Sequence, residues 1–118
     1  MNEIILNEKT VQFQTWFATA SKLVADYYAT NYPSLTPPVM TFDVGRRYIK
    51  VINETWHQSE DGIRTKTNSS VWAFIDRTTG DVLKPASWNA PAKHARGNVF
   101  NDDNGSANLT PYGPPYMK

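Results

Sequence analysis

Cationic and amide-bearing residues gather in one stretch of the chain, from Lys84 to Asn101. The stretch reads Lys-Pro-Ala-Ser-Trp-Asn-Ala-Pro-Ala-Lys-His-Ala-Arg-Gly-Asn-Val-Phe-Asn and contains no acid. Arginine offers phosphate a planar fork of donors, lysine offers a mobile point charge, and tryptophan offers a face on which a base can stack. The composition therefore predicts a binding site for a phosphate-bearing ligand.

The predicted site draws on charged, polar and aromatic residues of this stretch. They are Lys84, Ser87, Trp88, Lys93, His94, Arg96, Gly97 and Asn98. The backbone N–H groups of Gly97 and Asn98 would add donors if Gly97 adopts the left-handed conformation of an anion nest. A neighbouring strand would extend the patch with Arg46, Arg47 and Lys50.

An alternative interpretation makes the same residues structural, since surface cations are usually solvated or weakly paired. Trp88 would then cover the core beneath the loop. Lys93 and Arg96 would pair with nearby acids, namely Asp76, Asp81, Asp102 or Asp103.

Catalysis has little support in the chain. The two histidines, His57 and His94, have no recognised nucleophile or metal motif around them. The acid pairs Glu60–Asp61 and Asp102–Asp103 are adjacent in sequence, which is the wrong spacing for a calcium loop or a glycosidase pair. We therefore expect a non-enzymatic protein without catalytic residues, metal or cofactor.

Composition sets the limits of the function. With 118 residues the chain fits a single domain, 1–118, and a formal net charge of +1 argues against a polycation that coats duplex DNA. The absence of cysteine excludes disulfides and thiolate chemistry. Neither a signal peptide nor a spanning segment is recognisable, so we expect a cytoplasmic protein with no membrane partner.

One amphipathic helix is expected at about 8–30, with Asn7 as its N-cap and a stop at Asn31 before Pro33. Apolar residues recur at the i, i+3, i+4, i+7 spacing of a single helix face. They are Phe13, Trp16, Phe17, Ala20, Leu23, Val24, Tyr27 and Tyr28. Two roles remain open for this face, packing on a sheet or contact with another subunit.

Antiparallel strands are expected at about 39–84, because β-branched and aromatic runs alternate there with turn signals. Gly45 would mark a bend, residues 58–62 a reversal, and Gly80 a tight hairpin that needs positive φ. The predicted fold class is α+β, with the long helix packed on a three- or four-stranded meander. A basic loop at 84–101 would follow.

The C-terminal residues 102–118 are expected to form an extended Pro/Tyr-rich tail. Its aromatic and apolar side chains suggest docking, either on the chain's own sheet or on a neighbouring subunit. The residues that would make this interaction are Tyr112, Tyr116 and Met117. A loose tail is the alternative.

Four segments of the chain resemble segments of a known protein family. They are Trp72-Ala-Phe-Ile-Asp76, Thr79-Gly-Asp81, Lys84-Pro-Ala-Ser-Trp88 and Ala90-Pro-Ala-Lys-His-Ala-Arg-Gly-Asn98. They are similar to a family of small tailed-bacteriophage proteins in which a "FID-TGD-KPASW" hairpin continues into "APAKxARGN". The resemblance covers about a quarter of the chain and brings no activity or site residues with it. It implies a phage protein made in the host bacterial cytoplasm, concerned with nucleic acid, virion assembly or counter-defence.

Three hypotheses of function follow. The first is a binder of phosphate-bearing ligands, whose partner is a short single-stranded nucleic acid or a small nucleotide signal. The second is a protein-interaction module that contacts a host protein or forms a homo-oligomer through Trp88 and its aromatic tail. The third is a structural component of the virion or of its assembly machinery.

Overall fold

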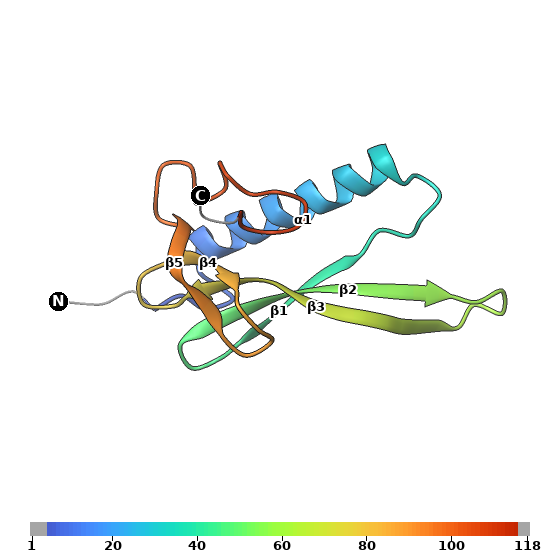
Figure 1. Ribbon diagram of the computed structural model, residues 1–118, viewed down its shortest axis with the longest axis horizontal. Helices are drawn as coiled ribbons and strands as arrows, with labels where there is room; N and C mark the ends of the chain where they lie inside the picture. The colour runs from blue at the N-terminus through green and yellow to red at the C-terminus, as the bar shows by residue number, and fades with distance from the viewer. Residues whose placement is uncertain (1–4, 116–118) are drawn as a thin grey trace.

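The computed structural model describes residues 5–115 as one helix and a five-stranded antiparallel sheet (Figure 1). Helix α1 spans Val11–Asn31, and the strands are β1 (Val39–Val44), β2 (Tyr48–Gln58), β3 (Arg64–Asp76), β4 (Asp81–Pro85) and β5 (Pro91–Asn98). The strands lie in the sheet in their chain order. The α+β class and the antiparallel sheet are thus confirmed, while the expected three or four strands are one or two too few.

Helix α1 begins three residues later than expected. The Oδ1 atom of Asn7 accepts the N–H of Lys9 at 2.7 Å, and the Asn7 carbonyl accepts the N–H of Thr10 at 3.1 Å. Asn7 therefore closes a turn of its own, and the predicted N-cap is wrong because Thr10 occupies that position. The buried side chains of the helix are Phe13, Trp16, Ala20 and Val24.

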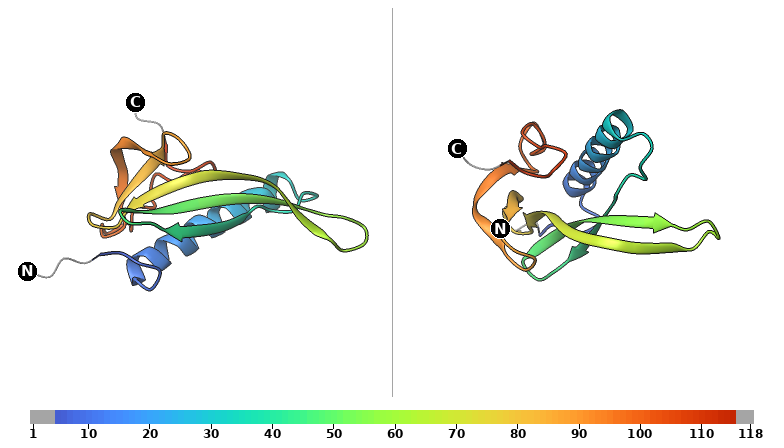
Figure 2. Two further views of the ribbon diagram at one scale, coloured as in Figure 1. Left: turned by 90° about the horizontal axis from the view of Figure 1, so that it is seen from below. Right: turned by 45° about the vertical axis from the view of Figure 1, so that its right-hand side comes forward.

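The main core lies between α1 and the sheet face that carries Ile49, Val51 and Ile75 (Figure 2). Trp16 meets Trp72 edge to face, with ring centroids 5.9 Å apart. Aromatic pairs of this kind contribute roughly 0.5–1.5 kcal/mol beyond the burial of their area. The aromatic residues of the helix are therefore used largely to join it to the sheet.

The second face of the sheet, called here the outer face, has apolar residues of its own. Phe74 and Leu83 are directly paired neighbours on β3 and β4, and both are buried outside the helix-side core. The Tyr48 ring lies 5.8 Å from that of Phe74. This small cluster supports the surface on which several of the predicted site residues lie.

The predicted basic loop at 84–101 is largely a β-hairpin, and this prediction was wrong. Strands β4 and β5 pair antiparallel, and only residues 86–90 form the loop between them. Pro85 lies opposite Pro91, at the two strand ends, and β5 is the edge of the sheet. Proline is tolerated at such positions because no ladder N–H is required there. The tight turn at Gly80 is as predicted, with a φ of 82°.

Residues 101–115 fold back over the sheet in a series of turns instead of extending. The indole N–H of Trp72 donates to the carbonyl of Pro111 at 3.1 Å, and the hydroxyls of Tyr27 and Tyr112 are 2.7 Å apart. Pro114 is fully buried. This part of the predicted tail lies against the chain's own sheet and helix, whereas Tyr116 and Met117 fall outside the described residues.

Strands β2 and β3 extend as a two-stranded ribbon beyond the rest of the sheet (Figure 1). This β2–β3 arm comprises residues 55–68, which lie beyond the pairing with β1, and its connecting turn is at 59–63. The molecule measures 56 Å along its longest axis and 28 and 26 Å across. The β4–β5 hairpin and the turn at the tip of the arm therefore lie far apart.

Candidate functional site

The predicted phosphate-site residues divide into two groups in the structure. Lys84 and Arg96 belong to the first group, which contacts the chain itself. The Nζ atom of Lys84 donates to the carbonyl of Pro114 at 3.2 Å, and the Nε atom of Arg96 donates to the carbonyl of Pro115 at 2.9 Å. Arg96 also donates from Nη1 to the carbonyl of His94. These two cations hold the C-terminal residues against the sheet.

Gly97 and Asn98 also serve the fold. The glycines with positive φ in residues 5–115 are Gly62, Gly80, Gly105 and Gly113, so the predicted left-handed nest at Gly97 is wrong. Gly97 is required for close approach instead, since a Cβ there would lie 3.0 Å from the carbonyl oxygen of Gly105. Asn98 donates from Nδ2 to the Thr79 carbonyl at 2.8 Å and to Asp81 at 3.0 Å.

The second group remains at the surface. Lys93 and His94 are exposed on β5, while Ser87 and Trp88 are exposed in the β4–β5 loop. Trp88 keeps 47% of its surface in solvent, and the Nζ atom of Lys50 lies 4.6 Å from the centre of its ring. Trp88 therefore does not cover the core, and a predicted extension residue, Lys50, lies beside it.

Two shallow hollows lie on the outer face, and of the surface group only Lys93 lines one of them. The first holds about 260 Å³ and is lined by Arg46, Arg47 and Lys50, with Asn89 facing them from the β4–β5 loop. The second holds about 400 Å³ and is lined by Arg47 and Lys93 among others. We call the five residues Arg46, Arg47, Lys50, Trp88 and Lys93 the outer basic surface. The predicted strand extension is thus part of it.

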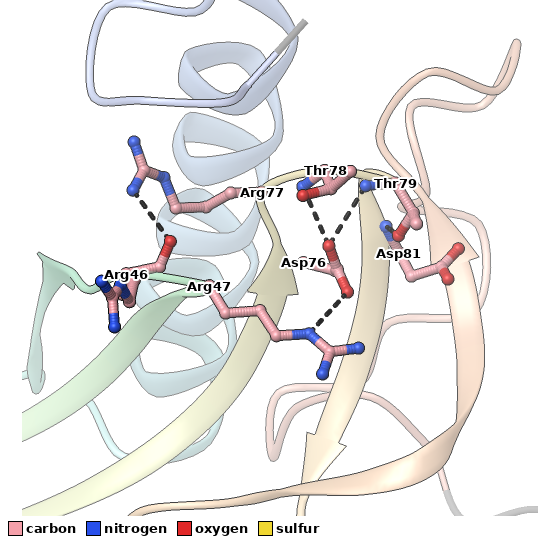
Figure 3. Close-up of polar contacts among 7 residues, drawn as sticks. All are labelled: Arg46, Arg47, Asp76, Arg77, Thr78, Thr79 and Asp81. Carbon is pink, nitrogen blue, oxygen red and sulfur yellow. Dashed lines mark hydrogen bonds and ion pairs between the residues drawn. The ribbon is translucent and has the colours of Figure 1, made fainter. Parts of the chain in front are cut away.

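Asp76 orients the central arginine of this surface (Figure 3). Its Oδ2 atom lies 3.6 Å from the Nε atom of Arg47, and its Oδ1 atom accepts the N–H groups of Thr78 and Thr79 at 2.9 and 3.1 Å. Asp76 is only 6% exposed, so its carboxylate is a fixed support. The guanidinium of Arg47 also lies 5.1 Å from the ring centre of Tyr48. Arg47 is positioned but keeps most of its donors at the surface.

The charge of the surface is moderate. Asp43 lines the first hollow, and Asp76 and Asp81 line the second. These three aspartates partly offset the four cations of the outer basic surface, so any attraction for an anion is confined to the immediate surroundings of those cations. The pairing of Lys93 and Arg96 with aspartates, which the alternative interpretation expected, is not found within residues 5–115.

Arg77 is a structural residue that the sequence analysis did not single out. It donates from Nε to the carbonyl of Leu6 at 2.7 Å, and from Nη1 to the carbonyls of Gly45 and Arg46 at 2.7 and 3.2 Å. One side chain therefore fixes the β1–β2 turn that carries Arg46 and Arg47 (Figure 3). No local sequence signal indicates this role, because each acceptor is at least 31 residues away.

Asn89, which lines the first hollow, was also not predicted as a site residue, although its position between Trp88 and Pro91 in the basic stretch was a usable signal.

Over residues 5–115, no group of three or more histidine, aspartate or glutamate side chains is arranged to hold a metal ion. In the same range, α1 is not apolar enough to cross a bilayer.

Comparison with known proteins places the chain in a family. No curated protein and no solved structure matches it significantly. One family model matches residues 7–111, a range that includes the helix, all five strands and most of the C-terminal turns. The chain therefore belongs to this family, which is described as a family of unknown function (DUF7717).

Proposed function

We propose that the protein binds a phosphate-bearing ligand on its outer basic surface and acts by binding alone. One observation carries the proposal: an exposed indole, Trp88, lies beside a hollow lined by Arg46, Arg47 and Lys50. A nucleotide needs both parts of this arrangement, since its base stacks on a ring and its phosphate takes charged donors. The ligand is therefore a nucleotide or a short single-stranded nucleic acid.

The cations of the surface have different parts in this proposal. The side chains of Arg46 and Lys93 make no polar contact within the described residues, so their donors are available. Arg47 is held by Asp76 and offers an oriented fork. Four of the predicted site residues are not part of the proposed ligand site, because their polar groups or their close packing stabilise the fold. They are Lys84, Arg96, Gly97 and Asn98.

The proposed setting is a bacterial cell infected by a tailed phage. The similarity of segments 72–76, 79–81, 84–88 and 90–98 to small phage proteins supports this setting. There the protein would bind the nucleic acid of phage or host, or withdraw a nucleotide signal used in host defence.

Gentle purification tests the proposal directly. The expected result is a raised absorbance at 260 nm relative to 280 nm, above the baseline set by four Trp and six Tyr. Mass spectrometry of an acid extract should then identify a nucleotide or an oligonucleotide. A protein-like spectrum, an empty extract and no binding of added nucleotides or oligonucleotides at low salt would contradict the proposal.

A charge-matched pair of variants locates the site. Arg46→Ala with Lys93→Ala removes two surface cations and should weaken binding of the extracted ligand at least tenfold, since each charge-assisted contact is worth about 1.5–3 kcal/mol. Lys9→Ala with Lys22→Ala removes the same charge elsewhere and should leave affinity within about twofold. Equal losses in both variants would indicate a general electrostatic effect and no site.

A second candidate function is a protein interaction. Tyr112 is 71% exposed and stands against Tyr27, whose ring also meets that of Tyr32 at 6.0 Å. Exposed tyrosines are typical anchors of protein interfaces. If this cluster forms a homo-oligomer, Tyr112→Ser should lower the sedimenting mass while ligand binding is retained. An unchanged sedimenting mass would exclude homo-oligomerisation through this cluster.

A further inference from the structure

The outer face of β2 continues from the outer basic surface into the β2–β3 arm without interruption. Strand β2 alternates regularly, because both register shifts between β2 and β3 insert their extra residue on β3, at Trp72 and Thr67. Side chains two apart on a regular strand share a face. Lys50 and Trp56 therefore lie on the same face of β2, and Ile49 and Val51 on the helix side.

A second aromatic and cationic pair lies on the arm. The guanidinium of Arg64 stands 5.3 Å from the ring centre of Trp56. Trp56 is half-buried and Arg64 is exposed. The pair repeats the arrangement of Trp88 and Lys50, in which a cation lies 4.6 Å from an indole centre. Two indoles, each with its own cation, thus flank the outer face of β2.

A third hollow extends from Trp88 toward the arm. It holds about 350 Å³ and is lined on one side by Ser69 and Val71 of β3 and on the other by Ser87 and Trp88. Serine hydroxyls can donate to phosphate oxygens, and the apolar wall is formed by Val71 and Trp88. The surface beside Trp88 is therefore hollowed on the side toward the arm, and it offers both polar and apolar contacts to a strand.

The length of this surface selects the ligand. Lys50 and Trp56 are six residues apart on β2, which is about 20 Å at a rise of about 3.3 Å per residue. One nucleotide cannot contact both pairs, whereas a short single strand can. Small folds that bind single strands cover roughly 4–16 nucleotides and combine a cationic groove with stacked aromatic rings.

The charges fit a single strand better than a duplex. Glu54 lies on the same face of β2, but the Nζ atom of Lys66 lies 3.5 Å from its carboxylate and offsets its charge. Asp76 offsets Arg47 in the same way, so Arg64 and Lys50 remain as cations along this face, and the whole chain has a formal net charge of only +1. A duplex offers no exposed base faces to the indoles, so it would rely on charge alone.

Resting on the proposed function, we infer that the ligand is a single strand of nucleic acid that runs along β2 from the outer basic surface to Trp56 and Arg64 on the β2–β3 arm. The strand stacks one base near Trp88 and another near Trp56. Its intervening phosphates pass over the third hollow. The arm is then part of the binding site and not a spacer.

Fluorescence anisotropy with end-labelled oligothymidylates of ten and of two nucleotides tests this inference, with oligouridylates run beside them to distinguish DNA from RNA. The ten-nucleotide probe should bind more tightly than the two-nucleotide probe. Trp56→Ala should weaken the longer probe roughly 5- to 150-fold, as expected for one lost stacking contact, and leave the shorter probe unchanged. Trp56→Phe should recover most of the loss.

His57→Ala provides the matched control, because His57 neighbours Trp56 on the same strand but points to the opposite face. It should leave both probes unchanged. Arg64→Ala gives a second measurement on the arm, and it should lower the slope of log affinity against log salt by about 0.7 for the longer probe. Circular dichroism establishes that each variant is folded.

The possible failures are distinguishable. If both probes bind equally well and neither arm variant changes affinity, while Arg46→Ala with Lys93→Ala still weakens binding, the strand along β2 is wrong and the proposed function stands. If the wild-type protein binds neither probe nor any nucleotide at low salt, the proposed function fails and this inference fails with it.

Discussion

The cations at the two ends of the molecule have different kinds of contact partner, backbone carbonyls at one end and surface side chains at the other. At the end built from β4, β5 and residues 101–115, Lys84 and Arg96 donate to carbonyls of the chain's own C-terminal residues. On the β2–β3 arm, Arg64 lies over an indole and Lys66 pairs with Glu54 at the surface. A cation that lies near a returning segment is used to hold it, whereas a cation on a two-stranded ribbon has no such segment nearby.

The difference extends to the backbone. The end that carries β5 holds close approaches between distant segments, such as Gly113 against the carbonyl of Trp72. The arm is held by contacts between its own two strands, including the hydroxyl of Thr67 donating to the Thr55 carbonyl at 3.1 Å. We therefore expect the β5 end to govern the free energy of unfolding and the arm to tolerate change.

The largest expected effect comes from substituting glycines at the two ends. Gly113 has a φ of 110°, and a Cβ there would lie 2.5 Å from the Trp72 carbonyl oxygen. Gly113→Ala should lower the free energy of unfolding by about 2–5 kcal/mol, through strain and overpacking. Gly62, in the turn of the arm, has a φ of 87° with open space around it, so Gly62→Ala should cost only about 1 kcal/mol.

Urea unfolding followed by tryptophan fluorescence measures both variants. Gly62→Ala should keep most of the wild-type free energy of unfolding and the wild-type slope of that free energy against urea concentration. Equal losses in Gly113→Ala and Gly62→Ala would remove the distinction between a tightly packed β5 end and a tolerant arm.

An intermediate effect is expected for the two arginines. Arg96→Ala removes the hydrogen bonds to Pro115 and His94 and should cost about 1–2 kcal/mol, with faster amide exchange in residues 109–113. Arg64→Ala removes only an exposed contact with an indole and should cost about 0.5–1 kcal/mol, without a change in exchange at the β5 end.

Hydrogen exchange read by mass spectrometry separates these outcomes. If Arg96→Ala leaves the exchange of residues 109–113 unchanged, then Arg96 does not hold the C-terminal residues. It would then return to the set of candidate ligand contacts.

The smallest effect is a pH dependence at the tip of the arm. The hydroxyl of Ser59 donates to Asp61, and this hydrogen bond, aided by the N–H of Ile63, lowers the pKa of the Asp61 carboxyl. A lowered folded-state pKa means that the carboxylate stabilises the turn above its unfolded pKa of about 3.9 and loses this contribution as pH falls through the folded value.

Proton NMR of the Ser59 and Ile63 amides between pH 2 and pH 6 should therefore show a transition below pH 3.9, with little change in global stability. Asp61→Asn should abolish that transition. A transition centred above pH 3.9 would contradict the lowered pKa.

Local signals account for the features that the sequence alone predicts correctly. Asn31 followed by Tyr32 and Pro33 indicates the end of the helix, and α1 does end at Asn31. Gly80 indicates a tight hairpin, and its φ is positive. Both features depend on conformational preferences of a few adjacent residues, which act in the same way wherever the segment lies in the fold.

The role of the basic stretch could not be predicted in this way. Its prolines and glycine disfavour a strand, but β5 forms as an edge strand, where a missing N–H is tolerated and Gly97 admits the backbone of Gly105. The residue types alone do not distinguish Arg96, which holds Pro115, from Lys93, which remains exposed.

Residue type and short-range spacing were enough to indicate an α+β chain, its helix, its strands within 39–84 and a concentration of cations and tryptophan. The tertiary structure decided which cations hold the chain and which face solvent, and it set Lys50 beside Trp88 from a strand 38 positions earlier. The physical reason is the separation along the sequence over which each interaction acts. Backbone preference is local, whereas the partner of a long flexible side chain is whatever carbonyl, carboxylate or ring the folded chain brings within a few ångströms.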